Sequence, residues 1–102
     1  MRGTINFIVT ANEAEYVFNK KDFKYMYILA GAGTTSNIYI EFQAENNLID
    51  HDLITLTVTK QFASRIVKDI SENINLNGHH EIKHSQSTGI YKHVTIMTYT
   101  AG

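Results

Sequence analysis

The sequence contains no cysteine, no proline and no tryptophan in its 102 residues. Without cysteine, the chain has no disulfide framework, no thiolate metal site and no thiol nucleophile. Proline accounts for about 5% of an average sequence, so its absence implies that glycine, asparagine and aspartate end the helices and strands here. No apolar run approaches the roughly 20 residues of a membrane-spanning helix, and we expect no membrane partner. The first residues, 1–4, lack the apolar core of a signal peptide, which predicts a protein that is not secreted.

The charges are nearly balanced, with 9 Lys and Arg against 10 Asp and Glu and a net charge of −1. Proteins that bind nucleic acid through its backbone usually carry an excess of basic residues, so the composition argues against a general polyanion binder. Hydrophobic residues make up 43% of the chain and charged residues 19%, which is typical of a folded globular protein and not of a disordered one. The length suits a single domain over residues 1–102.

Alternation of apolar and polar residues dominates the sequence and predicts β-strands. Ile54, Leu56 and Val58, with threonines between them, show the pattern most clearly. It predicts strands near 4–11, 16–18, 23–29, 38–43, 54–58, 81–84 and 91–100. The short connections at 19–22 and 85–89 would make the strands on either side of them antiparallel neighbours.

The period changes to 3.6 residues between 60 and 75. Phe62, Ile66, Ile70 and Ile74 are spaced four apart and form one apolar stripe, which predicts an amphipathic helix with Thr59 as its N-cap. An exit through the glycine at position 78 would end it. The predicted fold class is therefore α+β: a curved antiparallel sheet or open barrel of five to seven strands, with one amphipathic helix packed on it.

Several predicted strands carry aromatic or apolar residues on both faces. In the last strand, Val94 and Ile96 would lie on one side, with methionine and tyrosine on the other. One helix covers one face of a sheet, so we expect a second subunit to cover the other; the alternative is a closed barrel whose exterior tolerates tyrosine. The residues expected on the uncovered side, as an interface or ligand surface, are Tyr25, Tyr27, Tyr39, Met97 and Tyr99.

Two histidines, His80 and His84, form the best metal candidate in the sequence. On a strand they would lie about 13 Å apart, too far to share one ion, so exposed polar residues are the simpler interpretation. His79 could still meet His93 across a hairpin. An acidic stretch lacks the calcium-loop pattern and is interpreted as a solvated loop; it comprises Glu41, Glu45, Asp50 and Asp52.

The loop at 31–36 contains two glycines, but it lacks the third glycine of a dinucleotide-binding loop and the lysine of a nucleotide-triphosphate loop. No Gly-x-Ser-x-Gly motif or sequence-placed triad supports nucleophilic catalysis. We therefore predict no catalytic residue, no metal and no cofactor.

Lys24 lies among aromatic residues in the segment 23–27, and such a strand can stack nucleic acid bases. The local charge around it is +2, from Lys20, Lys21, Asp22 and Lys24, while the whole chain is −1. A single-stranded nucleic acid or small ligand on the tyrosine face is thus the second hypothesis, and nucleic acid is not the favoured partner.

The helix segment 60–70, the preceding Thr-Leu-Thr-Val-Thr at 55–59 and a composition rich in residues with AT-rich codons carry a family resemblance. The chain resembles the small uncharacterised proteins of marine cyanophages and related ocean viruses. The resemblance implies a virus-encoded structural or accessory protein, located in the host cytoplasm or the virion. Together with the surplus of aromatic residues, it predicts a non-enzymatic protein that associates with itself as a homo-oligomer.

Overall fold

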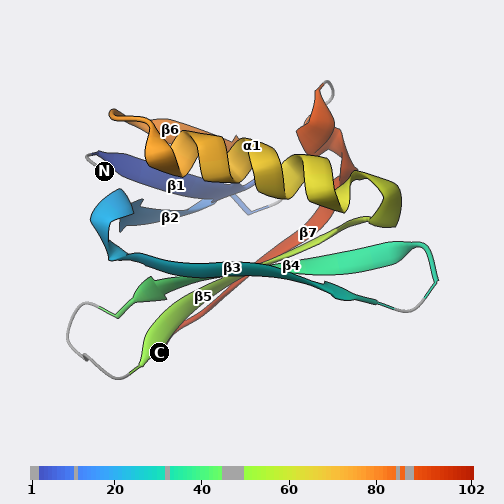
Figure 1. The fold of residues 1–102 in the computed structure, drawn as a ribbon, viewed down its shortest axis with the longest axis horizontal. Coiled ribbons are helices and arrows are strands. Elements are labelled where there is room, and N and C mark those ends of the chain that lie inside the picture. Colours follow the sequence, from blue (N-terminus) through green and yellow to red (C-terminus); the bar gives the residue numbers. More distant parts are fainter. Residues whose placement is uncertain (1–2, 11, 32, 45–49, 85, 87–88) are drawn as a thin grey trace.

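The computed structural model describes residues 3–10, 12–31, 33–44, 50–84, 86 and 89–102. Its strands are β1 (Thr4–Val9), β2 (Ala14–Asn19), β3 (Phe23–Ala30), β4 (Thr35–Gln43), β5 (His51–Thr59), β6 (His80–Lys83) and β7 (Val94–Thr100). One α-helix, α1 (Ala63–Asn75), lies between β5 and β6 (Figure 1). The predicted fold class is confirmed: the protein is α+β, with mostly antiparallel strands and one helix.

The strands form two sheets. The smaller sheet has the order β2-β1-β6, and the larger has the order β3-β4-β5-β7. All neighbouring strands are antiparallel except β1 and β6, which are parallel. The prediction that short connections join neighbouring strands is wrong at two places, because β2 and β3, and β6 and β7, belong to different sheets. At the first place, a 3₁₀ turn over Lys20–Asp22 carries the chain from one sheet to the other.

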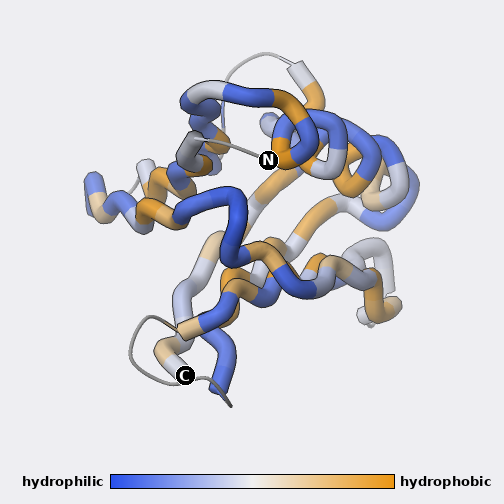
Figure 2. The backbone as a smooth tube through the Cα atoms, turned by 60° about the vertical axis from the view of Figure 1, so that its left-hand side comes forward, coloured by the Kyte–Doolittle hydropathy of each residue, from blue (hydrophilic) through white to orange (hydrophobic). Residues whose placement is uncertain are grey.

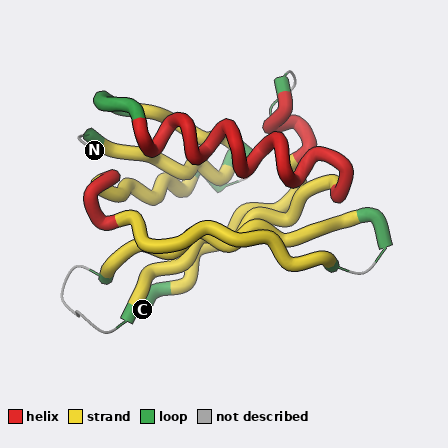
Figure 3. The backbone as a smooth tube through the Cα atoms, in the orientation of Figure 1, coloured by secondary structure: helices red, strands yellow, loops and turns green. Residues whose placement is uncertain are grey.

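The two sheets and the helix form two layers. Helix α1 and the sheet β2-β1-β6 lie side by side in one layer, and the four-stranded sheet forms the other (Figures 1 and 3). Hydrophobic and hydrophilic residues alternate along the strands (Figure 2), and the buried apolar side chains lie between the layers. These side chains form one buried core: Ile5, Phe7, Ile38, Ile40, Phe42, Ile54, Leu56, Val58, Ala63, Ile66, Ile70, Ile74, Ile82, Val94 and Met97.

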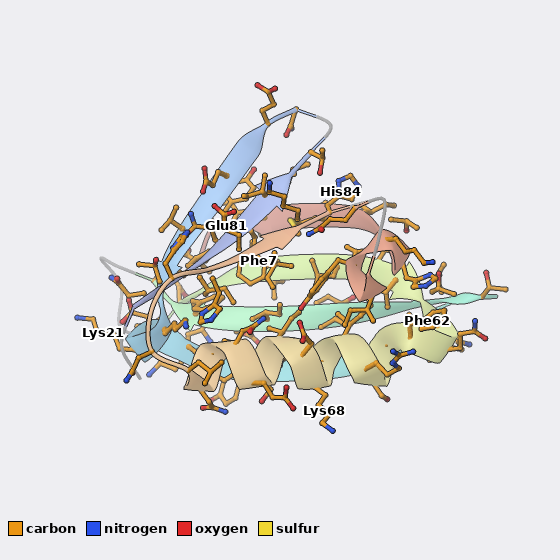
Figure 4. The ribbon with its side chains drawn as sticks, turned by 90° about the horizontal axis from the view of Figure 1, so that it is seen from above. Phe7, Lys21, Phe62, Lys68, Glu81 and His84 are labelled. Carbon is orange, nitrogen blue, oxygen red and sulfur yellow. The ribbon has the colours of Figure 1, made fainter. Side chains whose placement is uncertain are left out.

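Helix α1 buries the apolar stripe that the sequence predicts. Ala63, Ile66, Ile70 and Ile74 are its buried residues, and Lys68 points away from both sheets on the opposite side (Figure 4). Thr59 is not the N-cap of α1, because a 3₁₀ turn over Lys60–Phe62 comes first. Among the described residues, no helix is long and apolar enough to cross a membrane.

Strand β7 contains a bulge that changes which side chains face the core. The pairing with β5 runs Leu53–Thr100, Thr55–Thr98 and Thr57–Ile96, and then shifts, so that Val58 pairs with Val94. The extra residue lets Val94 and Met97, three positions apart, both point into the core. The expectation that Val94 and Ile96 share a face is therefore wrong.

Candidate functional site

The four-stranded sheet has one face between the layers and one face that no other described element covers. We call the uncovered side the outer face. It consists of three rows of residues paired across β3, β4, β5 and β7: Tyr25-Glu41-Leu53-Thr100, Tyr27-Tyr39-Thr55-Thr98 and Leu29-Asn37-Thr57-Ile96.

Large apolar and aromatic side chains are exposed on this face. Tyr25 is 58% exposed, Leu29 55%, Ile96 53% and Tyr27 41%. Scattered apolar residues on a surface are ordinary, but a contiguous group rimmed by polar residues marks a contact site. On the outer face Tyr25, Tyr27 and Leu29 form such a group along β3, with Tyr39 stacked on Tyr27, while Ile96 lies at the opposite edge, beyond Asn37 and Thr57. The exposed tyrosines give the β3 side of this face the composition of an interface.

Side-chain contacts restrict the positions of Tyr27 and Tyr39 on this face. Tyr27 and Tyr39 lie directly opposite each other on β3 and β4, with ring centroids 5.3 Å apart and an interplanar angle of 20°. Partial burial raises the pKa of the Tyr27 hydroxyl, and a hydrogen bond to Glu41 raises it further. Glu41 also accepts a hydrogen bond from His51 at 3.1 Å. The stacking of Tyr27 on Tyr39 restricts both rings, which lowers the entropy lost when a partner covers them.

The structure places three of the five predicted surface residues on the outer face: Tyr25, Tyr27 and Tyr39. Met97 and Tyr99 are not there. Met97 is 4% exposed and belongs to the core, and the Tyr99 ring stacks on Tyr16 at 4.7 Å between the layers. The bulge before Ile96 is the physical reason, since one extra residue reverses the alternation of every side chain after it.

Ile96 takes the outer-face position that the sequence assigned to Met97. Nothing in the local sequence marks the bulge, because the run 94–97 reads as a regular strand in either phase. Leu53 was also missed, since the strand predicted there begins one residue later. Its apolar side chain lies between Glu41 and Thr100, where alternation alone predicts a polar residue.

The histidines considered as metal candidates and interpreted as polar surface residues have separate partners. His79 bonds Thr4, His84 bonds the Thr95 carbonyl oxygen at 2.8 Å, and His93 stacks on Phe62 at 3.7 Å between centroids. The described residues contain no group of three or more His, Asp or Glu that could hold a metal ion. Of the acidic stretch, Glu45 lies outside the described residues.

His80 lies beside a buried lysine that the sequence did not single out. Lys20 is fully buried, and its ammonium donates hydrogen bonds to the Leu76 carbonyl oxygen at 2.6 Å and to His80 Nδ1 at 2.5 Å. Burial lowers the pKa of Lys20. Burial also lowers the pKa of His80, and the charge of Lys20 adds to the shift. This pair joins the C-terminal end of α1 to β6, and we interpret it as structural.

A shallow hollow of about 310 Å³ lies along β2 and is lined by Glu15, Tyr16, Val17, Phe18, Gln43, Asp52 and Tyr99. Its size is at the lower limit for a small-molecule site. Both carboxylates are already engaged, since Glu15 accepts a hydrogen bond from the Asn6 amide and Asp52 accepts one from the Gly102 N–H at 2.9 Å. The outer face is therefore the stronger candidate.

Comparison with known proteins adds no further constraint. No family model, no curated protein and no solved structure matches this chain.

Proposed function

We propose that the protein is a non-enzymatic, self-associating structural or accessory module whose contact surface is centred on the outer face. The observation that carries this proposal is the exposed group of Tyr25, Tyr27 and Leu29 on β3, with Ile96 at the opposite edge, on a sheet whose other face packs into the core. Tyrosine suits such a surface because it offers a large apolar area and keeps a polar tip that tolerates water in the free protein.

A second copy is the favoured occupant because the outer face offers little charge to a charged partner. Glu41 is the one charged residue in its three rows, and no lysine or arginine lies there. A neutral patch of this kind complements itself without like-charge repulsion. On the resemblance to viral proteins, we place the role in the assembly of a virus particle or in the host cytoplasm during infection.

A small ligand or a single-stranded nucleic acid is the alternative occupant. The observation that favours it is the stacked pair Tyr27–Tyr39, which could hold a planar ring. The absence of basic residues from the outer face weighs against nucleic acid, because neutralisation of phosphates supplies most of the affinity in such complexes.

Sedimentation equilibrium tests the proposal on the wild-type chain over a wide concentration range, with and without a mixed oligonucleotide. We expect a defined oligomer that the oligonucleotide does not change. Tyr27→Glu combined with Tyr39→Glu should yield a monomer with an unchanged far-ultraviolet helix signal, because it buries two charges in the contact. Val17→Glu is the matched control, since Val17 is 57% exposed on β2 of the other sheet.

A wild-type protein that remains a monomer at high micromolar concentration would rule out self-association. Binding of the oligonucleotide by that monomer, lost in the double variant, would establish the alternative function instead.

A further inference from the structure

Strand β3 lies at an edge of the four-stranded sheet, and no other strand of the described residues pairs with its open side. It is eight residues long, and its one charged residue, Lys24, lies at a register shift against β4 near the start of the strand, so that the regular edge runs from Tyr25 to Ala30. Its remaining side chains are aromatic or aliphatic, and most of β3 is exposed. Soluble proteins normally protect such edges with charges, proline, bulges or a covering element, because an open edge is a template for another strand.

The backbone groups that β3 leaves open can be identified. The Gly31 N–H donates to the Thr35 carbonyl oxygen at 3.1 Å and so makes a hydrogen-bonded pair at the turn into β4. Such pairs alternate along an antiparallel ladder, so Leu29, Tyr27 and Tyr25 direct their N–H and C=O groups towards β4. Met26 and Ile28 then direct theirs to the open side.

We propose that two copies of the chain pair through β3, antiparallel, about a two-fold axis at Tyr27, and so join their four-stranded sheets into one continuous eight-stranded sheet. This inference rests on the proposed self-association and assigns a contact at the sheet edge to it; the outer faces of the two copies then form one continuous face. A C₂ contact of this kind uses the same edge on both copies.

The side chains on the outer face select this register. Directly opposite residues in an antiparallel pair must share a face, so the axis passes through a residue and not between two residues. An axis at Tyr27 places Tyr27 opposite Tyr27 and Tyr25 opposite Leu29, so all three exposed outer-face residues of β3 meet a partner. An axis at Ile28 would place Tyr25, the most exposed of them, opposite a glycine.

The same register pairs the open backbone groups and separates the charges. Met26 of each copy bonds Ile28 of the other. The two Lys24 side chains lie six residues apart along the ladder, or about 20 Å, so they do not repel each other strongly.

Helix α1 has room for a second copy beside it. It contacts both β3 and β4, so its axis lies roughly between them. With strands about 4.8 Å apart, the two helices of the dimer would then lie about 10 Å apart, at the upper end of normal helix packing. Asp69 faces Tyr91, on the side of β7, and the helical repeat places Ser64, Val67 and Ser71 on the opposite flank, towards the β3 edge.

The surface area buried between the two copies sets the expected affinity of the dimer. The exposed parts of the β3 side chains amount to roughly 400 Å² per copy, about half of what a stable interface buries. The flank of α1 adds area. We therefore expect a dimer whose population depends on concentration in the micromolar range.

A single introduced thiol tests the register, because the chain contains no cysteine. In Tyr27→Cys the two thiols face each other with Cα atoms about 4.5 Å apart, within the range for a disulfide. In the control Tyr25→Cys they are about 14 Å apart along the strand. Diamide, which takes up the two hydrogens, should cross-link Tyr27→Cys at least tenfold faster. Equal rates, or faster reaction of the more exposed Tyr25→Cys, would overturn the register.

A proline tests the edge itself. Ile28→Pro removes an N–H that points to the open side and leaves the ladder with β4 intact. The matched control is Val17→Pro on β2, where Val17 lies opposite Asn6 of β1. Tyr16 and Phe18 make the hydrogen-bonded pairs with β1, so the Val17 N–H points to the open edge of β2. Ile28→Pro should weaken the dimer by roughly 30-fold or more, and Val17→Pro should not.

Hydrogen exchange on the wild-type chain needs no variant and covers the case in which Ile28→Pro does not fold. The amides of Met26 and Ile28 should exchange more slowly as concentration rises, while that of Val17 does not change. An oligomer without this protection would overturn the β3 edge and leave the proposed function standing. A protein that stays monomeric at all concentrations would contradict both the β3 contact and the proposed self-association.

Discussion

The two faces of the four-stranded sheet are made by alternate residues of the same strands, yet they differ in every physical respect. Ile38 and Ile40 are fully buried on the inner face, and Tyr39 between them lies on the outer face with its ring against Tyr27. Leu56 is fully buried, and its neighbours Thr55 and Thr57 are not. In each strand, the side chains of the inner face thus stabilise the fold, and the side chains of the outer face remain available for contacts.

Among the described residues, Lys20 is the one buried side chain with a cationic group; the other buried polar residues are Asn6 and Ser36. Lys20 is as fully buried as the core isoleucines, although it lies in a polar turn beside the exposed Lys21. Its bonds to the end of α1 and to His80 explain how a cation is tolerated there. Beside the outer face, Glu41 accepts a hydrogen bond from His51, and both side chains are only partly buried.

The same substitution in the core beneath α1 and on the outer face should give the largest contrast. Ile70→Ala should lower the free energy of unfolding by about 2–5 kcal/mol, because it opens a cavity under α1 where the side chain is fully buried. Ile96→Ala should cost less than about 1 kcal/mol, since that side chain is 53% exposed. Urea unfolding at low protein concentration measures both. Similar losses for the two variants would break the comparison.

The buried lysine gives the second contrast. Lys20→Met keeps the apolar stem but leaves the Leu76 carbonyl and His80 Nδ1 without their donor, which should cost about 1–3 kcal/mol. Lys21→Met, one residue away on the surface, should change stability by less than about 0.5 kcal/mol. An unchanged or raised stability of Lys20→Met would show that desolvation of the ammonium outweighs its bonds.

Much of the fold can be predicted from the sequence because the alternation is regular. The existence of β4, β5 and α1 follows from the spacing of Ile38, Ile54 and Ile66 and their repeats, but both strands begin three residues before the predicted position and α1 begins three residues after it. The division into two sheets cannot be read in the same way. The connection at Lys20–Asp22 looks like a hairpin loop, and its role depends on the burial of Lys20, a tertiary contact 56 residues away from Leu76.

The candidate surface was predictable where the strand is regular and not where it is bulged. Tyr25, Tyr27 and Tyr39 follow directly from the period of two, because β3 and β4 pair without interruption over that stretch. Met97 and Tyr99 were misplaced because one extra residue in β7 inverts the alternation. The open edge of β3 was not predictable either, since it depends on which strands become neighbours.

The smallest expected effect is the pH dependence of stability that arises from His80 beside the buried Lys20. The pKa of His80 is lowered from its usual 6.5 by burial, then by the charge of Lys20 and of His79; Glu81, which lies 3.6 Å from His79, is the nearby acid. Above pH 6.5 His80 is neutral in both the folded and the unfolded chain. As the pH falls below 6.5 the unfolded chain binds a proton that the folded chain does not, so stability decreases.

The urea midpoint should therefore fall more steeply between pH 7 and about 5 in the wild type than in His80→Gln, which does not titrate and can still accept the Lys20 bond. Equal slopes for the wild type and His80→Gln would show that the buried pair does not couple folding to pH.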